Sequence, residues 1–467
     1  MDPLDVAMMT GELLSKPLHV GAVLILSPPA KAGPRYVDKL YRDGLVASSK
    51  LDPRLLRHPH RGLDTGGVWV WRNVEHVDQR RHVERRTLPS GAGKSELWKL
   101  VSELHAEQLD RSRPMWKFYL IDGLEDARFA FYMKVHHTLV DGVAGLQMIA
   151  DTLTTDPKRR SMGHFYGVRP AEPHDHTGAA HGLFPNPFPL IRSLVGAALS
   201  GVDLTRQVAA GEVSNLVRSL TTKTAPLPYN APFTRFNGPV GRGRTFAAGS
   251  WPKARIRAVQ KAAGVTGNDV LTAVLAGTLR SWFIAHDELP KKSLVALCPI
   301  TVRGREHEAD DGHANLFGAV LCPLGTDLTD PAERLALIHA AMAEGKHQVA
   351  IRGSGASMLL VAPSIAPTIL LPMFPFAPRL RAGYNLPFSN VPGPKAEMYW
   401  NGAHVDEIYP ISVAFDGQAL NVTVCSYADR VGFGYVAGRE VLPDIDTLVP
   451  LTEQSLVELE TAVGVLS

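Results

Sequence analysis

The sequence has few cysteines and little net charge, and each scarcity excludes classes of protein. Only Cys298, Cys322 and Cys425 occur among 467 residues, and no CxxC pair is present. Neither a disulfide framework nor a thiolate zinc site is indicated, so a reducing cytoplasm is the expected compartment. The formal net charge is +3. Because no basic stripe interleaved with aromatics occurs either, nucleic acid is not an expected partner.

Three familiar signals are also missing. The N-terminus, MDPLDVAMMTGELLSK, has no basic segment followed by an apolar one, so no secretory signal is indicated. No GxSxG elbow occurs, so no serine-hydrolase nucleophile is visible. The segment Gly91–Ser95 ends like a phosphate loop, but Leu88 stands where the full pattern needs its first glycine. We expect instead that Ser95 caps a helix beginning near Glu96.

One stretch, Gly353 to Pro378, carries no charged side chain and includes five prolines. Interior prolines remove backbone donors, and the freed carbonyls are costly in lipid, so a simple membrane-spanning helix is not expected. Two interpretations stay open. The stretch forms broken helices packed inside the protein, which we favour, or an apolar surface that rests on a bilayer or lipid droplet.

The order of strand-like and helical patterns predicts two mixed α/β lobes. Residues 1–187 alternate β-branched and aromatic runs with helical patterns, and they end in a linker rich in proline, glycine and histidine. Residues 188–235 predict a helical crossover. Residues 236–467 repeat the α/β texture and close with an amphipathic helix. The predicted fold class is therefore α/β (α+β), with two lobes joined by the linker and crossover.

The segment FAFYMKVHHTLVDG carries the residues best suited to chemistry. An apolar strand leads into two histidines, and because side chains alternate along a strand, His136 and His137 are expected on opposite faces. Opposite faces argue against one shared metal ion, and we expect no metal site. His137 shares the apolar face with Met133 and Val135, where desolvation keeps an imidazole neutral and available as a general base. His136 is expected to be structural.

The rest of the motif leaves two roles open for Asp141. Its carboxylate orients His137, or it pairs with a distant arginine and holds the turn in shape, which we favour. Gly142 provides the backbone freedom of the turn. The alternative for the whole motif is a core histidine with satisfied hydrogen bonds beside a tight turn.

With these residues in place, the chain resembles a known family. HHTLVDG matches the HHxxxDG signature of the CoA-dependent acyltransferases, which include chloramphenicol acetyltransferases and condensation domains. The opening residues, Pro114–Trp116, Asn268–Asp269 and Ser389–Pro394 are similar to the N-terminus, PLW, ND and NVPGP elements of the bacterial wax ester synthase/diacylglycerol acyltransferase family. Met115 replaces the leucine of PLW, which is a small change between apolar side chains.

This resemblance implies two chloramphenicol-acetyltransferase-like lobes and a reaction without a covalent acyl-enzyme. The expected catalytic residues are His137, His136, Asp141 and Gly142. The expected substrate-binding residues are Asn268, Asp269, Ser389, Asn390 and Trp116. Among these, Asn268, Ser389 and Asn390 are candidates for the oxyanion donor. Each has a cap or turn role as its alternative, and for Trp116 a core position is favoured.

The expected activity is transfer of a long acyl chain from acyl-CoA to diacylglycerol, which makes triacylglycerol. The resemblance implies no cofactor beyond acyl-CoA as substrate, with peripheral attachment to the inner membrane or lipid droplets. A long-chain fatty alcohol, giving a wax ester, is the second acceptor. The rival hypotheses are a condensation-type enzyme that takes its acyl group from a carrier protein, and a lipid carrier or droplet-coat protein without catalysis. The intact histidine motif argues against the carrier.

Overall fold

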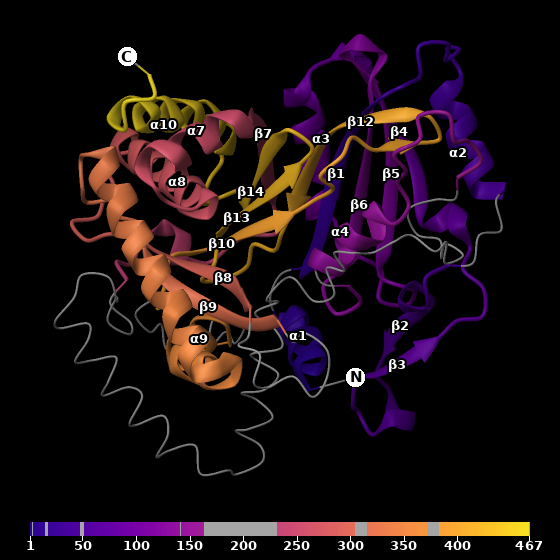
Figure 1. The fold of residues 1–467 in the computed structure, drawn as a ribbon. Coiled ribbons are helices and arrows are strands. Elements are labelled where there is room, and N and C mark those ends of the chain that lie inside the picture. The colour runs from indigo at the N-terminus through magenta and orange to yellow at the C-terminus, as the bar shows by residue number, and fades with distance from the viewer. Residues whose placement is uncertain are drawn as a thin grey trace.

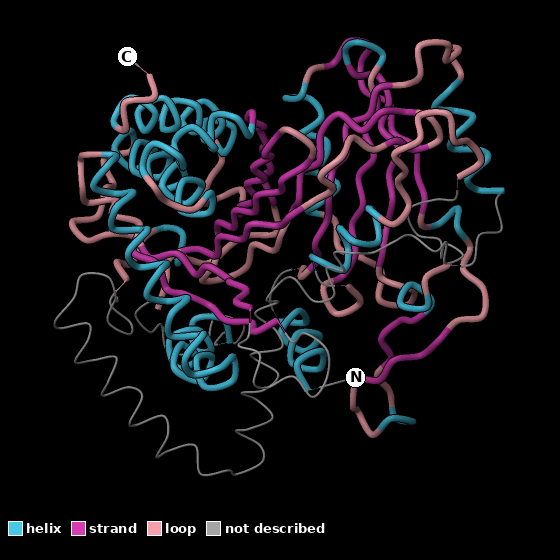
Figure 2. The backbone as a smooth tube through the Cα atoms, viewed as in Figure 1, coloured by secondary structure: helices cyan, strands magenta, loops and turns pink. Residues whose placement is uncertain are grey.

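The chain folds into two lobes, each built on a six-stranded sheet (Figure 1). The computed structural model describes residues 1, 3–14, 17–46, 51–140, 142–162, 231–303, 315–370 and 383–466. Figure 2 shows the strands of both sheets running through the middle of the molecule, with helices along the outer side of the second sheet. Both sheets mix parallel and antiparallel neighbours, so the predicted fold class is confirmed.

The first sheet has the strand order β11-β12-β1-β6-β5-β4. Its strands β4 and β5 are parallel, and the other neighbouring pairs are antiparallel. The bounds are β1 His19–Ser27, β4 Val83–Ala92, β5 Trp116–Leu124, β6 Phe129–His136, β11 Tyr399–Trp400 and β12 Ala403–Ile411. The apolar runs that predicted strands at β1, β5 and β6 are confirmed.

The second sheet has the order β7-β14-β13-β10-β8-β9, in which β10 is parallel to both of its neighbours. The bounds are β7 Arg244–Pro252, β8 Val295–Arg303, β9 Asn315–Pro323, β10 Leu386–Pro392, β13 Leu420–Tyr427 and β14 Arg430–Gly438. A separate two-stranded hairpin joins β2 (Arg57–His60) to β3 (Val70–Asn73).

Helices cover the faces of the two sheets. Their bounds are α1 Pro3–Leu14, α2 Tyr36–Val46, α3 Lys94–Ala106, α4 Gly142–Ala150, α7 Lys253–Ala263, α8 Gly267–Ala285, α9 Pro331–Leu370 and α10 Leu448–Ala462. Helices α7 to α10 pack on one face of the second sheet, and their apolar side chains form one core with that face. The other face is left for the first lobe.

A shared apolar cluster joins the lobes. It combines Trp98 of α3 and Tyr132 of β6 with Phe246 of β7 and Val436 of β14. The Phe246 N–H also donates to Ser102 Oγ of α3 at 2.8 Å. Because this cluster is buried and contains residues of both sheets, the two lobes pack directly against each other.

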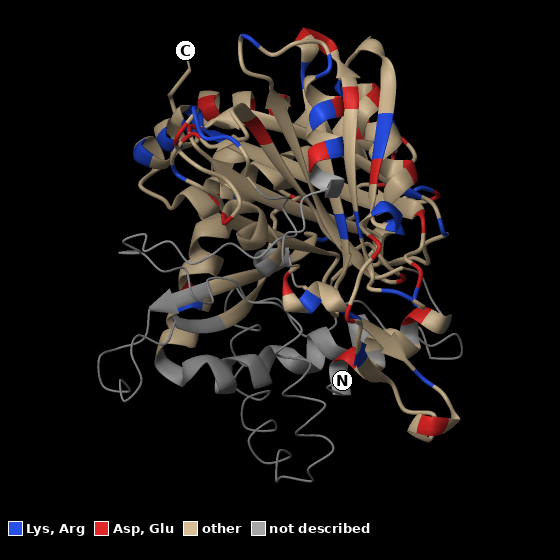
Figure 3. Cartoon of the chain, turned by 90° about the vertical axis from the view of Figure 1, so that its right-hand side faces the viewer, with Lys and Arg blue, Asp and Glu red and all other residues tan. Residues whose placement is uncertain are grey.

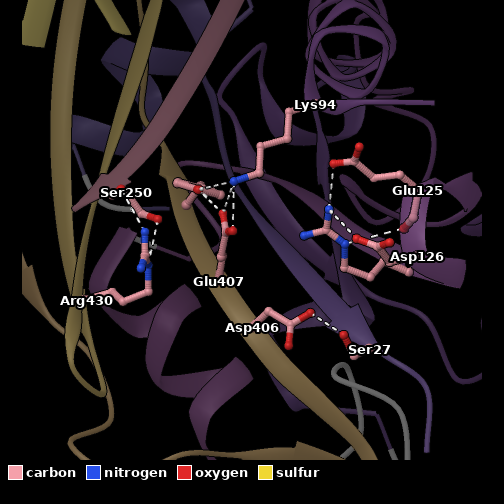
Figure 4. Close-up of polar contacts among 10 residues, drawn as sticks. Ser27, Lys94, Glu125, Asp126, Ser250, Asp406, Glu407 and Arg430 are labelled. Atoms are coloured by element: carbon pink, nitrogen blue, oxygen red, sulfur yellow. Dashed lines mark hydrogen bonds and ion pairs between the residues drawn. The ribbon is translucent and has the colours of Figure 1, made fainter. Parts of the chain in front are cut away.

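Strand β12 crosses from the second half of the chain into the first sheet. Residues of the predicted C-terminal lobe, Tyr399–Ile411, therefore pair beside β1, which the prediction of two sequential lobes did not include. Polar contacts reinforce the crossing (Figure 4). Lys94 Nζ lies 2.7 Å from both carboxylate oxygens of Glu407, and Ser27 Oγ donates to Asp406 Oδ2 at 2.7 Å. The predicted boundary between residues 187 and 188, and most of the crossover 188–235, lie outside the described residues.

Two glycines of β14 permit the close approach of β12. A Cβ atom at Gly434 would lie 2.1 Å from the Pro410 carbonyl oxygen, and one at Gly432 would lie 2.8 Å from that of Ile408. The alternation GFG thus places glycine where the backbone of β12 passes and Phe433 on the helix-covered face. The close packing at the lobe junction therefore depends on the absence of a side chain at these two glycines.

Two local expectations were wrong. Helix α3 begins at Lys94 with Gly93 as its N-cap, and the Glu96 carboxylate accepts from the Gly93 N–H at 3.0 Å, so Ser95 is not the cap. Helix α9 continues through Pro363 and Pro367, where broken helices were favoured. A proline withdraws one donor, whereas the turns on either side of it keep theirs. The remaining prolines of that stretch lie outside the described residues. Among the described helices, none is both long and apolar enough to cross a membrane.

Replacing Gly434 with alanine should weaken the lobe junction. The added methyl group would overlap the Pro410 carbonyl, and we expect a loss of about 1–3 kcal/mol in the free energy of unfolding, the usual cost of overpacking. Urea unfolding followed by tryptophan fluorescence measures the loss. Gly33→Ala is the matched control, because a Cβ there meets nothing within 4 Å, and it should change the value by less than about 0.5 kcal/mol. Equal unfolding midpoints for the two variants would contradict this account.

Candidate functional site

The histidine motif sits at the end of β6, in a turn held by both neighbouring strands. The His136 N–H donates to the Met115 carbonyl at 2.9 Å, just before β5. The His137 N–H donates to the Leu18 carbonyl at 3.0 Å, just before β1. The Leu139 N–H then closes the turn on the His136 carbonyl at 2.9 Å, and α4 begins at Gly142. Three backbone hydrogen bonds thus fix both histidines.

The His136 imidazole is buried and has a neighbour at each ring nitrogen. Its side chain is 1% exposed. The Thr138 N–H donates to Nδ1 at 3.2 Å, and the Thr138 hydroxyl lies 2.7 Å from the same nitrogen. Because Nδ1 accepts, the ring proton belongs on Nε2, which lies 3.4 Å from Glu12 Oε2. These contacts hold the His136 ring in a fixed orientation.

Glu12 of α1 contacts several residues that hold the histidine motif. Its Oε1 accepts from the Leu18 N–H at 3.1 Å, and Leu18 in turn holds the backbone of His137. Its Oε2 faces His136 and accepts from the Arg111 guanidinium at 3.1 and 2.8 Å. One buried carboxylate therefore connects the helix, both histidines and an arginine.

The electrostatics of Glu12 follow from these neighbours. Burial by itself raises the pKa of a carboxyl group. His136 and Arg111 lower the pKa of Glu12 by more than burial raises it, so the pKa falls from 4.5 to about 2. The carboxylate is thus charged across the physiological range. Glu12 is not among the residues predicted from the sequence, although a signal for it exists: it follows Met8 and Met9 by four and three residues, so it interrupts the buried stripe of α1.

The face alternation of β6 was predicted correctly up to the end of the strand. Phe131, Met133 and Val135 pack in the cluster that includes α1 and α4, and Tyr132 packs in the inter-lobe cluster. His137 itself lies in the turn beyond the strand and is partly exposed. Strand alternation ends at His136 and does not determine the direction of the His137 side chain. Asp141 lies outside the described residues, and its two proposed roles stay predictions.

Trp116 is a core residue, as favoured. Its side chain is 1% exposed, and its indole N–H donates to the Leu55 carbonyl at 3.0 Å. The His82 ring stacks on it with 4.2 Å between centroids, and His82 Nδ1 lies 2.8 Å from the Trp116 carbonyl oxygen. Trp116 thereby supports β5 directly beside the strand that carries the histidines.

In the second lobe, Asn268 and Asp269 open helix α8 but point to different partners. Asp269 is 1% exposed, and its Oδ2 accepts from the Thr266 N–H at 2.9 Å, which completes a capping box. The same oxygen lies 2.8 Å from His339 Nδ1 of α9. Asn268 Oδ1 accepts from the Asn390 side-chain amide at 3.3 Å. The structure therefore joins the two predicted elements through Asn268 and Asn390, whereas Asp269 holds a helix start.

Ser389 and Asn390 are adjacent on β10 and face opposite sides of the second sheet. Asn390 pairs with Val424, which packs in the helix-covered core, whereas Ser389 pairs with Thr423. Thr423 and Asn421 alternate with core residues along β13, so their side chains and Ser389 lie on the face turned toward the first lobe. Thr423 Oγ1 donates to Asn421 Oδ1 at 3.3 Å. The sequence carries this signal in the alternation LNVTV, where Asn421 and Thr423 stand between apolar residues.

One apolar cluster includes residues of that face and of the histidine turn. Cys425, next along β13, belongs to the same cluster as Leu139 and Val140, which follow His137. Within the described part of the chain, no group of three or more His, Cys, Asp or Glu side chains is placed to hold a metal ion. The arrangement therefore offers an imidazole at the end of β6 and hydroxyl and amide groups on the inner face of β10 and β13.

Solved structures define the class of fold. A condensation domain of the CDA synthetase superposes with a TM-score of 0.54 at 13% identity and covers 99% of this chain and 95% of that domain. A wax ester synthase/diacylglycerol acyltransferase from Marinobacter aquaeolei VT8 superposes with a TM-score of 0.76 at 31% identity, with 99% of both chains covered. The chain thus has the two-lobed fold of condensation-type enzymes.

The family follows from the sequence comparisons. Residues 1–271 match the wax ester synthase/diacylglycerol acyltransferase catalytic domain, and residues 313–460 match the C-terminal domain of the same family. A probable diacylglycerol O-acyltransferase of Mycobacterium tuberculosis H37Rv is 36% identical over 467 residues, which is all of this chain and 99% of the relative. The chain belongs to the wax ester synthase/diacylglycerol acyltransferase family, and it is an acyltransferase as the sequence predicted.

Glu12→Gln should destabilise the protein in a pH-dependent way. The folded-state pKa of Glu12, about 2, lies below its ordinary value of 4.5, so its charge stabilises the fold above that value and this stabilisation is lost as pH falls toward 2. The difference between the two pKa values corresponds to roughly 3 kcal/mol in the free energy of unfolding. Urea unfolding across a pH series measures it, with exposed Glu103→Gln as control. A constant gap between wild type and Glu12→Gln from pH 7 down to pH 3 would contradict the assignment.

Proposed function

We propose that this chain transfers a long acyl chain from acyl-CoA to the free hydroxyl of diacylglycerol, releasing triacylglycerol and CoA. Membership of the family and the diacylglycerol O-acyltransferase activity in the name of the mycobacterial relative support the proposal. The single observation that carries it is the frame around the histidines. His136 is enclosed by Thr138 and Glu12, and the partly exposed His137 is fixed beside it.

In the proposed reaction, His137 is the general base. Its neutral imidazole takes the hydroxyl proton of the acceptor as the oxygen attacks the thioester carbonyl carbon. The carbon–sulfur bond then breaks, and the leaving thiolate of CoA takes the proton from the imidazolium, which regenerates the base. The thioester is already an activated acyl donor, so the proposed route needs no cofactor beyond acyl-CoA. General-base catalysis of this kind contributes about 10²–10⁴-fold in rate.

The oxyanion that forms during attack needs a hydrogen-bond donor on the face where the lobes meet. Among the three candidates, Ser389 is on the inner face of the second sheet. Asn390 points to the helix-covered side, where its amide nitrogen donates to Asn268. We therefore propose Ser389 as the donor, with Thr423 beside it on β13. Asn268 and Asn390 hold the β10 and α8 elements together.

A fatty alcohol is the second acceptor. The name of the Marinobacter enzyme combines wax ester synthase with diacylglycerol acyltransferase, which supports testing both acceptors. Both are dissolved in lipid rather than in water. We propose that the protein meets them at the cytoplasmic surface of the inner membrane or of a lipid droplet.

His137→Ala should abolish most of the acylation while leaving the fold intact. Purified wild type and variant would be incubated with labelled palmitoyl-CoA and, separately, dioleoylglycerol or hexadecanol in detergent micelles. Wild type should form triacylglycerol, and the rate of the variant should fall by about 10²–10⁴-fold because the hydroxyl loses its base.

Two controls make that result specific. His76→Ala removes an exposed histidine outside the motif and should keep the wild-type rate. Circular dichroism should give the same spectrum for all three proteins. Full activity of His137→Ala would refute the base, and no product with either acceptor would refute the acceptor class and lead to carrier-bound acyl donors.

Ser389→Ala and Asn390→Ala separate an oxyanion donor from a structural residue. Loss of the hydroxyl should lower kcat by about 10²-fold or more with little change in KM, as for a contact made only in the transition state. Loss of the Asn390 amide should instead lower the free energy of unfolding by about 1 kcal/mol, because Asn268 loses its partner. Steady-state kinetics and urea unfolding on both variants decide between the roles. An unchanged kcat for Ser389→Ala would remove it from the mechanism.

A further inference from the structure

The β2–β3 hairpin stands away from both sheets. Figures 1 and 3 show it at the lower edge of the first lobe, with its connecting loop pointing outward. That loop carries Leu63, whose side chain is fully exposed at 102%, and Val68, at 55%. Single exposed apolar residues are common on protein surfaces. Here, however, a fully exposed leucine and a second apolar side chain lie on the same protruding loop, where a partner could bury both.

The hairpin tip, defined here as Arg61 to Val68, is an ordered structure. Gly67 N–H donates to the Gly62 carbonyl at 3.0 Å, and Val68 N–H donates to the Thr65 carbonyl at 3.1 Å. The Arg61 guanidinium Nε closes the tip by donating to the Gly67 carbonyl at 2.7 Å. The exposed leucine is thus held outward by the backbone, and little conformational entropy would be lost when it is buried in a partner.

Basic residues follow the hairpin from its base to this apolar tip: Arg57 and Arg72 are on the strands, and Arg61 is at the tip. Arg57 stacks over Trp71 with 4.9 Å to the ring centre, and Arg61 stacks over Trp69 at 5.8 Å. Arg72 pairs with Asp64 of the tip, which is the one acidic residue between positions 57 and 72. Three arginines against one aspartate leave the hairpin basic. A second copy of this hairpin would bring like charges together, which disfavours self-association through it.

An apolar tip with basic side chains on the hairpin behind it fits the interface of an anionic lipid layer, where the apolar groups enter the acyl region and a guanidinium group reaches the phosphates. We propose that the hairpin tip docks this protein on anionic phospholipid, with Leu63 and Val68 inserted and Arg61 at the headgroups. No covalent step is involved.

The base of the hairpin connects the docking site to the histidines. The Leu55 carbonyl, two residues before β2, accepts the indole N–H of Trp116, and Trp116 pairs with Val135 on the strand that ends at His136. Trp69 and Trp71 pack in the apolar cluster that also includes Val135 and Leu139. Docking would therefore hold the histidine end of the first sheet toward the lipid in which the acceptor dissolves, a consequence that rests on the proposed function.

Vesicle binding tests the docking without any catalysis. Full-length protein is floated with phosphatidylcholine vesicles that contain or lack phosphatidylglycerol, with no acyl-CoA present. Leu63→Glu should lower the binding constant by about tenfold or more, the loss expected when one leucine leaves an apolar phase. Arg61→Gln should lower it about fivefold on the anionic vesicles and hardly at all on phosphatidylcholine. Raising salt from ~0.1 M to ~1 M should abolish this arginine effect.

Matched controls and a second readout separate docking from folding and from chemistry. Ile284→Glu, at a site 49% exposed in α8, and Arg257→Gln, exposed in α7, should bind vesicles like wild type. Acylation of diacylglycerol should be unchanged in detergent micelles for Leu63→Glu and should fall with vesicles. Three outcomes would overturn the docking proposal. Leu63→Glu could bind vesicles as tightly as wild type, Ile284→Glu could lose as much binding as Leu63→Glu, or the wild type could bind no vesicles. A fall of Leu63→Glu activity in micelles would also overturn it, because the tip would then act on the site itself.

Discussion

The structure around the histidine motif depends on one buried charge, the carboxylate of Glu12. Taking a carboxylate out of water is costly, and it is tolerated here because Arg111, His136 and the Leu18 N–H all face it. The same carboxylate orients the motif, since it faces Nε2 of His136 and accepts from the N–H of Leu18, whose carbonyl holds the His137 backbone. Helix α1 is thus part of the site, although it lies more than a hundred residues before the histidines.

A second constraint is the route of β12. This strand leaves the second half of the chain and pairs with β1, so the first sheet is complete only when the whole chain has folded. The passage is narrow, and the glycines at Gly432 and Gly434 allow it because any Cβ there would strike a carbonyl of β12. Lys94 and Glu407 then tie α3 to the crossing strand. The two lobes are consequently fixed to each other.

The inner faces of the two lobes carry different polar groups. The first lobe presents the histidine turn, and the second presents Ser389, Thr423 and Asn421 on adjacent strands. Asn268 and Asn390 lie on the other side of the second sheet, where they join a helix to a strand. Residues that share a family motif can therefore have different tasks, and strand parity separates Ser389 from Asn390.

The sequence by itself determined the class of fold, most strands and helices, the histidine motif and the family, because these depend on local periodicity and on residue order. Parity along β6 was correct as far as the strand extends, and it did not apply to His137, which lies in the turn. Local rules failed at two helix positions: Gly93 rather than Ser95 is the N-cap of α3, and α9 continues past two prolines. Only the tertiary structure brought Glu12 to His136, placed β12 in the first sheet and showed Leu63 to be exposed. Each of these depends on residues far apart in the chain, whose proximity no local pattern encodes.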